Sequence, residues 1–210
     1  MSITNLWIIR HGETNWNLER RLQGWTDIDL NQRGIEQAEN LARYLSNGFF
    51  SNPPDHIYSS DLQRAYDTAQ AVANKFTMNV TQIHGLRERH YGVLEGQSWE
   101  LLKDLRELNK CSSGIELSEQ EHKAESLNIF YQRIQETLHT LAQQHAGQTL
   151  LLFSHGGAID MMWRIAKGLD FYAAREVVQK NTAINHLQID PNLGMHVKQW
   201  GFAEHIVDSL

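Results

Sequence analysis

The chain has 210 residues, of which 41% are hydrophobic, and carries a formal net charge of −6. This length can bury one sizeable core, and the acidic balance argues against nucleic acid or an anionic membrane as the main partner, because both attract a basic surface. The single cysteine, Cys111, excludes an intramolecular disulfide and suits a reducing compartment. No apolar run approaches the length of a membrane span. We therefore expect a cytoplasmic protein.

Strand-like and helix-like patterns alternate along the chain. Continuous apolar runs indicate strands buried on both faces, and apolar residues at helical spacing indicate amphipathic helices. In chain order, the predicted elements are a strand at 6–9, a helix at 35–45, a strand at 56–59, helices at 62–76 and 127–141, a strand at 150–153, a helix at 158–167, and two closing strands near 184–189 and 197–200. The alternation predicts an α/β fold, a three-layer α/β/α arrangement around a mostly parallel central sheet.

The chain shows no internal repeat and no linker-like tract. We therefore expect one domain over residues 1–210. The most irregular stretch is 109–125, which contains Cys111-Ser-Ser-Gly114. We interpret the region around 97–125 as a variable loop or lid and not as a domain boundary.

Three predicted strands end in polar residues. Arg10-His11-Gly12 follows the first strand, and Ser154-His155-Gly156-Gly157 follows the strand at 150–153. Ser59-Ser60-Asp61 ends the strand at 56–59, with Arg64 one turn into the next helix. Because active sites in parallel sheets lie beyond the carboxyl ends of the strands, these residues are expected to face one pocket.

These residue types suit phosphoryl transfer, which needs fixed positive groups and N–H donors around the phosphate. Arg10 and Arg64 can grip phosphate oxygens in a bidentate manner, and His155 can donate to another. Gly156 lets the backbone approach and begins a helix whose free N–H groups favour an anion. His11 is then the candidate nucleophile, kept neutral because nearby arginines lower its pKa.

A leaving alkoxide needs a proton, so a general acid is expected. Glu88, in Leu86-Arg-Glu-Arg-His-Tyr-Gly92, is the preferred candidate, ahead of Glu13 beside His11. Each of these motifs occurs by chance on its own, and an isolated arginine or glutamate is more often a solvated surface residue. Their joint placement at strand ends is what favours a catalytic site.

The same residues resemble the motifs of the histidine phosphatase superfamily, in the branch that holds cofactor-dependent phosphoglycerate mutases and related small-molecule phosphatases. The resemblance lies in four blocks: Ile9-Arg-His-Gly-Glu-Thr-Asn-Trp-Asn17 with Arg21-Leu-Gln-Gly-Trp-Thr-Asp27, then Ser59-Ser-Asp-Leu-Gln-Arg-Ala65, then Leu86-Arg-Glu88 with Leu94-Glu-Gly96, and Ser154-His-Gly-Gly157. They span most of the chain. The resemblance implies a phosphoglycerate mutase-like fold.

For individual residues, the resemblance implies that His11 is phosphorylated, that Arg10, Arg64 and His155 bind the phosphate, and that Glu88 is the proton donor. It further implies contacts to phosphate or substrate from Asn17, Gln23 and Gly24. No metal is expected. No cofactor is expected either, apart from 2,3-bisphosphoglycerate if the protein is a mutase. The expected partner is a small phosphorylated metabolite.

Two activities share such a pocket, since the phosphoryl group passes to water in a phosphatase and to another substrate hydroxyl in a mutase. Tyr91, with Arg89, resembles the mutase form of the third block. Against this, the chain is short, and the stretch from Gly96 to Glu125 holds a single arginine for a substrate's second charged group. We favour a phosphomonoester hydrolase of the histidine acid phosphatase type. The alternatives are a phosphoglycerate mutase and, from another class, a non-catalytic module that binds a phosphorylated ligand.

The remaining histidines form no HExxH pair and do not join Cys111 at the spacing of zinc ligands, and no G-x-G-x-x-G follows the first strand. Trp25 and His90 are candidates for the mouth of the pocket. The sequence leaves the physiological substrate open, and it leaves the oligomeric state open too, a homodimer included.

Overall fold

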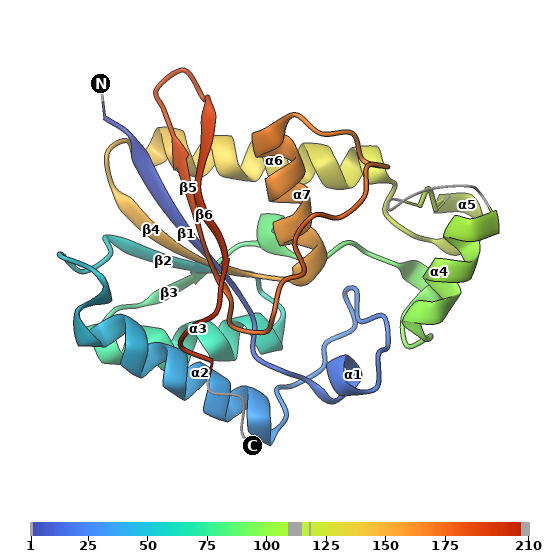
Figure 1. The fold of residues 1–210 in the computed structure, drawn as a ribbon, viewed down its shortest axis with the longest axis horizontal. Coiled ribbons are helices and arrows are strands. Elements are labelled where there is room, and N and C mark those ends of the chain that lie inside the picture. The colour runs from blue at the N-terminus through green and yellow to red at the C-terminus, as the bar shows by residue number, and fades with distance from the viewer. Residues whose placement is uncertain (1, 109–114, 118, 207–210) are drawn as a thin grey trace.

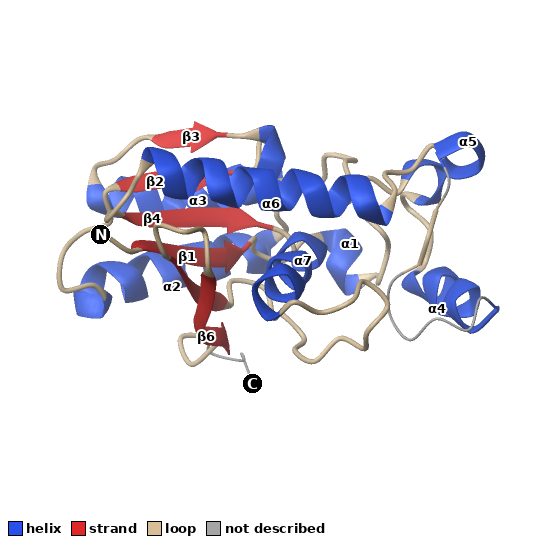
Figure 2. Cartoon of the chain, turned by 90° about the horizontal axis from the view of Figure 1, so that it is seen from above, coloured by secondary structure: helices blue, strands red, loops and turns tan. Residues whose placement is uncertain are grey.

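The computed structural model describes residues 2–108, 115–117 and 119–206. A twisted six-stranded sheet forms the middle layer and helices cover both of its faces (Figures 1 and 2). The strand order is β3-β2-β4-β1-β5-β6. The strands are β1 (Thr4–Arg10), β2 (His56–Ser59), β3 (Val80–Gln82), β4 (Thr149–Ser154), β5 (Ile184–Ile189) and β6 (Met195–Phe202). The α/β/α fold with a mostly parallel sheet is thus confirmed.

The first four strands are parallel. β1 pairs with β4, β4 with β2, and β2 with β3, all in the same direction. β5 runs antiparallel to β1 and pairs with β6 in a hairpin at one edge. The register aligns Arg10 with Ser154 and Ser59 with Phe153, so the carboxyl ends of β1, β2 and β4 reach the same edge of the sheet.

Two helical layers bury the two faces of the sheet. α2 (Gln32–Tyr44) and α3 (Gln63–Phe76) cover one face, and α6 (Leu127–Gln144) and α7 (Gly156–Lys167) cover the other (Figure 1). β4 contributes side chains to the hydrophobic cores on both faces of the sheet. Leu150 and Leu152 pack towards α6 and α7, while Leu151 and Phe153 pack towards α2 and α3. A strand buried on both faces reads as a continuous apolar run, as predicted.

Several short elements were not predicted. They are α1 (Asn15–Leu18), η1 (Leu45–Phe49), η2 (His84–Leu86), η3 (Gly92–Leu94), α4 (Trp99–Leu108), α5 (Glu119–His122) and strand β3. β3 is three residues long and mostly polar, so it has no apolar run to reveal it. The region 97–125 is not simply a loop, since it contains α4 and α5. The segment Cys111-Ser-Ser-Gly114 lies outside the described residues.

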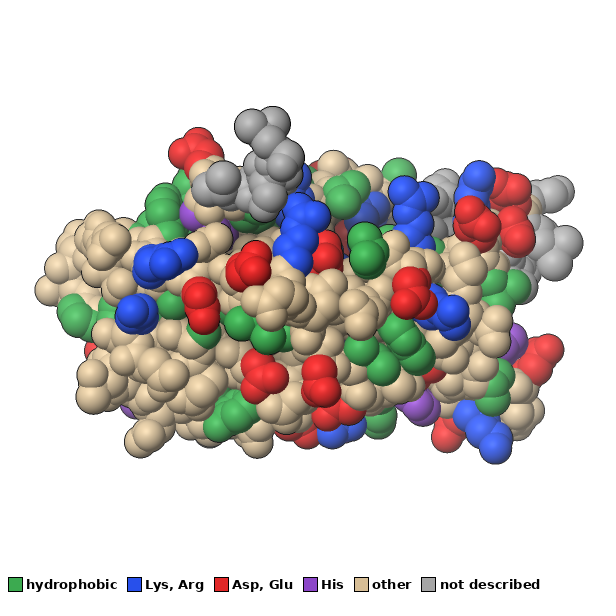
Figure 3. Space-filling view, turned by 90° about the horizontal axis from the view of Figure 1, so that it is seen from below, with side chains coloured by type: hydrophobic (Ala, Val, Ile, Leu, Met, Phe, Trp, Pro, Cys, Tyr) green, Lys and Arg blue, Asp and Glu red, His purple; other side chains and the backbone are tan. Residues whose placement is uncertain are grey.

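Acidic and basic side chains are interspersed on the face that lies below in Figure 1, which Figure 3 shows. Neither sign of charge dominates that face. Within the described ranges, every helix is too short or too polar to cross a bilayer.

Candidate active site

A cavity of about 270 Å³ opens at the carboxyl edge of the sheet. It is lined by nine of the ten residues that the sequence proposes for the site: Arg10, His11, Asn17, Gln23, Gly24, Arg64, Glu88, Tyr91 and Gly156. The tenth, His155, is fully buried, and its ring centroid lies 5.1 Å from that of His11. The fold therefore brings all ten residues into or directly behind one cavity.

His11 follows β1 and is 3% exposed. Its Nδ1 atom lies 2.6 Å from the carbonyl oxygen of Gly12. A carbonyl can only accept, so Nδ1 carries the proton and the lone pair of the neutral ring is on Nε2. Burial, and then the charges of Arg64 and Arg10, hold the pKa of His11 well below its usual value. The ring is thus held neutral with one nitrogen free to attack.

Gly12 is required by close packing between two chain segments. A Cβ atom at this position would lie 2.5 Å from the carbonyl oxygen of Gly34 at the start of α2. The N–H of Gly12 donates to Oγ1 of Thr68 on α3. The turn that carries His11 is therefore fixed by both helices on one face of the sheet.

Arg64, in the first turn of α3, is fully buried. Its Nη1 and Nη2 atoms donate to the carbonyls of Thr26 and Gly24, at 3.0 and 2.8 Å. The loop around these carbonyls is held in turn by the Glu95 carboxylate, which accepts the N–H groups of Trp25 and Thr26. Burial lowers the pKa of Arg64 to about 10, so it stays charged at neutral pH.

Arg10 and His155 complete the group around His11. Nη1 of Arg10 donates to the carbonyl of Gln179, and burial lowers the pKa of Arg10 to about 10. Nε2 of His155 lies 2.8 Å from Oγ of Ser60, which also accepts the N–H of Leu62. The Ser60 hydroxyl can donate its own hydrogen to Nε2, and in that arrangement the proton of the neutral His155 ring is on Nδ1. Burial, and then the charge of Arg64, keeps the pKa of His155 well below normal.

Three donor atoms in this group are buried and have no partner among the described residues: Nε of Arg10, Nε of Arg64 and Nδ1 of His155. Buried donors are almost always hydrogen-bonded in native proteins. Three such atoms on three neighbouring residues can therefore donate to one and the same ligand. A tetrahedral oxyanion with several oxygens would satisfy them together.

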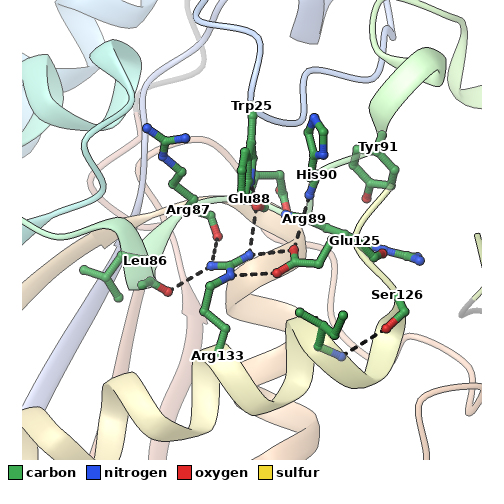
Figure 4. Close-up of polar contacts among 12 residues, drawn as sticks. Trp25, Leu86, Arg87, Glu88, Arg89, His90, Tyr91, Glu125, Ser126 and Arg133 are labelled. Carbon is green, nitrogen blue, oxygen red and sulfur yellow. Dashed lines mark hydrogen bonds and ion pairs between the residues drawn. The ribbon is translucent and has the colours of Figure 1, made fainter. Parts of the chain in front are cut away.

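Glu88 lies across the cavity from β1. Its Oε1 accepts the N–H of Arg89 and its Oε2 accepts the N–H of Gly157, both at 2.8 Å. A Cβ atom on Gly157 would lie 2.3 Å from Oε1 of Glu88, so glycine makes room for the carboxylate. The backbone carbonyl of Glu88 accepts the indole N–H of Trp25 at 2.7 Å (Figure 4). Trp25 thus supports Glu88 from behind and does not line the cavity.

Asn17 and Gln23 differ in how they are held. Oδ1 of Asn17 accepts from the backbone and hydroxyl of Thr14 and from Asn181. Oε1 of Gln23 is buried and has no partner in the part of the chain that the structure describes. His90 stacks near Trp25, with ring centroids 4.6 Å apart, and is not among the residues that line the cavity. The expectation that Trp25 and His90 form the pocket mouth was therefore wrong.

The sequence reasoning missed part of the lining. Arg21, Leu22, Trp99, Leu102, Arg175, Val178 and Gln179 also face the cavity. Arg175, Val178 and Gln179 lie in the chain that follows α7, and this part of the chain carries none of the recognised motifs. The expectation of little positive charge beside the phosphate site was wrong. That expectation rested on the arginine content of residues 96–125. Arg21 and Arg175 lie outside that stretch and still line the cavity.

The residues that the structure describes contain no group of three or more His, Cys, Asp or Glu side chains arranged to hold a metal ion. What surrounds the cavity is instead a histidine ring, buried arginines and a carboxylate at the carboxyl edge of a parallel sheet. This arrangement is that of an enzyme that transfers phosphoryl groups through histidine.

The chain belongs to the histidine phosphatase superfamily, branch 1, whose family model matches residues 6–202. It is 32% identical over 206 residues to phosphoglycerate mutase-like protein 4 of Arabidopsis thaliana, a match covering 96% of this chain and 86% of the plant protein. It is 34% identical over 160 residues to the metal-independent phosphoserine phosphatase of the same plant, which covers 75% of this chain and 66% of that protein.

A solved structure is also similar. A phosphoserine phosphatase variant from Entamoeba histolytica, in complex with phosphoserine, superposes with a TM-score of 0.83 and 28% identity, and the match covers 97% of this chain and 100% of that one. The resemblance stated from the motifs is thus confirmed. The chain is an enzyme of this superfamily, whose members here include phosphatases and a mutase-like protein.

Proposed function

We propose that this protein is a metal-independent phosphatase that hydrolyses a small-molecule phosphomonoester through a phosphohistidine on His11. The observation that supports this most directly is the group of three unpartnered buried donors around the His11 ring. They offer a phosphate three hydrogen bonds, and the free Nε2 offers it a nucleophile.

In the first step, Nε2 of His11 attacks phosphorus and the bond between phosphorus and the ester oxygen breaks. Arg10, Arg64 and His155 hold the three remaining phosphate oxygens as charge shifts between them. The departing alkoxide takes the proton of the Glu88 carboxylic acid and leaves as an alcohol. The proposed activity is that of a phosphomonoester hydrolase of the histidine acid phosphatase type.

In the second step, the ionised Glu88 takes a proton from a water molecule, whose oxygen attacks the phosphorus of phosphohistidine. The bond from phosphorus to Nε2 breaks, inorganic phosphate forms, and His11 regains its lone pair. No metal ion or organic cofactor takes part in either step. The one cysteine fits a reducing compartment, and we place the enzyme in the cytoplasm.

We infer that the substrate carries a second anionic group. Four arginines and one carboxylate, Glu88, line the cavity. Arg10 and Arg64 serve the phosphate, so Arg21 and Arg175 remain for another part of the ligand. Nε of Arg175 is paired with Asp160 and Nε of Arg21 is paired with Glu19, which hold the two side chains in place. A small metabolite with a carboxylate near its phosphate, as in phosphoserine, matches this charge distribution.

The same two arginines support the second candidate function, a phosphoglycerate mutase primed by 2,3-bisphosphoglycerate. Both activities would use the same phosphohistidine. They differ in the acceptor, so the products separate them.

Phosphorus NMR distinguishes the phosphatase from the mutase. The enzyme is incubated with 3-phosphoglycerate, a trace of 2,3-bisphosphoglycerate and EDTA, and in parallel with phosphoserine and other phosphomonoesters. Orthophosphate without isomerisation is the result expected of a phosphatase. Conversion to 2-phosphoglycerate with little orthophosphate would instead establish the mutase.

A further inference from the structure

A largely buried arginine outside the cavity holds the segment that carries Glu88. Arg133 lies on α6 with its side chain 13% exposed. Its Nη1 donates to the carbonyls of Gly85 and Arg87, both at 3.0 Å, and its Nη2 donates to the carbonyl of Glu88 at 3.1 Å. One guanidinium therefore fixes three carbonyls in a segment of four residues, as Figure 4 shows.

The remaining donors of Arg133 are taken by Glu125. Nε reaches Oε1 and Nη2 reaches Oε2, both at 2.8 Å, in a bidentate pair. The Glu125 side chain is 7% exposed. All five N–H groups of the guanidinium thus have acceptors, a pattern that the ammonium of lysine cannot reproduce.

Glu125 is itself bound to the chain segment beside Glu88. Its N–H donates to the carbonyl of His90 at 2.9 Å, and its carbonyl accepts Nε of Arg89 at 2.8 Å. The next residue, Ser126, caps α6 through the N–H of Ile129. The start of α6 and the segment 85–90 are therefore joined on both sides of the ion pair.

We propose that Arg133 is a positioning residue for the general acid, acting through the backbone of 85–88 to direct the Glu88 carboxyl group into the cavity. The proposal rests on the proposed role of Glu88. Without the guanidinium, three part-buried carbonyls lose this donor, and the Glu125 carboxylate loses its ion-pair partner and, among the described residues, keeps only the N–H of His90. In the described part of the chain, the proposed phosphate ligands Arg10, Arg64 and His155 come from other elements, and their hydrogen bonds go to groups other than Arg133.

The test compares alkyl phosphates, whose alkoxide needs a proton, with p-nitrophenyl phosphate, whose leaving group does not. We expect Arg133→Met to lower the ratio of kcat/KM for ethyl phosphate, which has no second anionic group, to that for p-nitrophenyl phosphate by about tenfold or more, in the direction of Glu88→Gln. In the double variant with Glu88→Gln, Arg133→Met should leave the ratio where Glu88→Gln alone puts it. Arg133→Lys should not restore the ratio, although it restores the charge.

Arg164→Met is the matched control. Arg164 is a buried helix arginine that also pairs with a carboxylate, Asp160, and donates to two backbone carbonyls. The Arg164→Met variant should lower the melting temperature about as much as Arg133→Met does. It should leave the ratio of the two kcat/KM values within about twofold of the wild-type ratio. If Arg133→Met does not fold, Arg133→Lys is measured in the same way.

Equal loss on both substrates in the Arg133 variants, with a clear ratio change in Glu88→Gln, would overturn the positioning role alone. No ratio change in Glu88→Gln itself would overturn the general-acid role and the inference with it.

Discussion

Nδ1 of His11 lies 2.6 Å from the carbonyl oxygen of Gly12, one residue further along the chain. This contact decides which ring nitrogen is protonated, because a carbonyl oxygen cannot donate. The turn that supplies this carbonyl needs glycine at position 12, since a Cβ atom there would lie 2.5 Å from the carbonyl oxygen of Gly34. The ring that we propose to carry the phosphoryl group is therefore oriented by its own backbone.

Replacing His11 by alanine removes the proposed nucleophile. We expect phosphomonoester turnover to fall by at least about a thousandfold, because covalent catalysis through this ring is lost. His90→Ala is the matched control, since that ring lies outside the cavity, and should keep most of the activity. Initial rates with p-nitrophenyl phosphate measure both. Turnover of His11→Ala near the wild-type rate would contradict the mechanism.

Gly157→Ala introduces a Cβ atom 2.3 Å from Oε1 of Glu88. The carboxylate must move, so kcat/KM for alkyl phosphates should fall by about tenfold or more, while helix propensity at 157 improves. Gly156→Ala is the milder neighbour, because its Cβ atom meets Nε of Arg10 only at 3.4 Å. Equal losses of kcat/KM in the two variants would contradict displacement of the Glu88 carboxylate as the cause.

Arg175→Met tests the second anionic group of the substrate. We expect the ratio of kcat/KM for phosphoserine to that for p-nitrophenyl phosphate to fall by about tenfold, the order of one charge-assisted hydrogen bond. Arg43→Met, which removes an exposed charge at the far end of α2, controls for the change in net charge. An unchanged ratio for Arg175→Met would remove this residue from substrate recognition.

Stability should fall as the pH is lowered below about 6.5. His11 and His155 have pKa values well below the usual value because of burial, while their unfolded-state values are normal. The unfolded chain therefore binds more protons at acidic pH, and each group lowers the free energy of unfolding by up to about 1.4 kcal/mol per pH unit below 6.5. Urea unfolding at pH 7.5 and 5.5 measures this. In His11→Asn, the free energy of unfolding should depend less on pH. The same dependence on pH as in the wild-type protein would contradict the lowered pKa of His11.

Excess EDTA should leave turnover unchanged. The proposed mechanism assigns every proton and phosphate contact to side chains, so no divalent ion is needed. Rates before and after chelation measure it directly. Loss of activity that added Mg²⁺ or Zn²⁺ restores would contradict the metal-independent mechanism.

The sequence predicted the core of the fold and of the site because both depend on local patterns. Leu150–Phe153 is apolar without interruption, and His11, His155 and Arg64 follow strands within one helical turn, so the edge rule for parallel sheets brings them together. All ten proposed residues lie at this edge. Their individual roles stay predictions.

The missed features depend on contacts between distant segments. Arg175 and Gln179 reach the cavity from the chain after α7, with no motif to mark them. The ion pair of Arg133 and Glu125 joins residues eight positions apart, and Arg133 also binds the backbone of the distant segment 85–88. In the sequence, each of the two residues on its own looks like an ordinary charged residue of a helix or loop. The helix α4 also went unpredicted within a region interpreted as a loop. Whether the 97–125 region closes over the cavity stays a prediction.

The central claim, a phosphoryl group carried on His11, is tested most directly by trapping the intermediate. Enzyme mixed with phosphate-labelled substrate is quenched in alkali within milliseconds, digested and examined by mass spectrometry. We predict phosphohistidine on the peptide that contains His11 in the wild-type enzyme, and none in His11→Asn. Label on another residue, or continued turnover with no labelled peptide, would contradict the account.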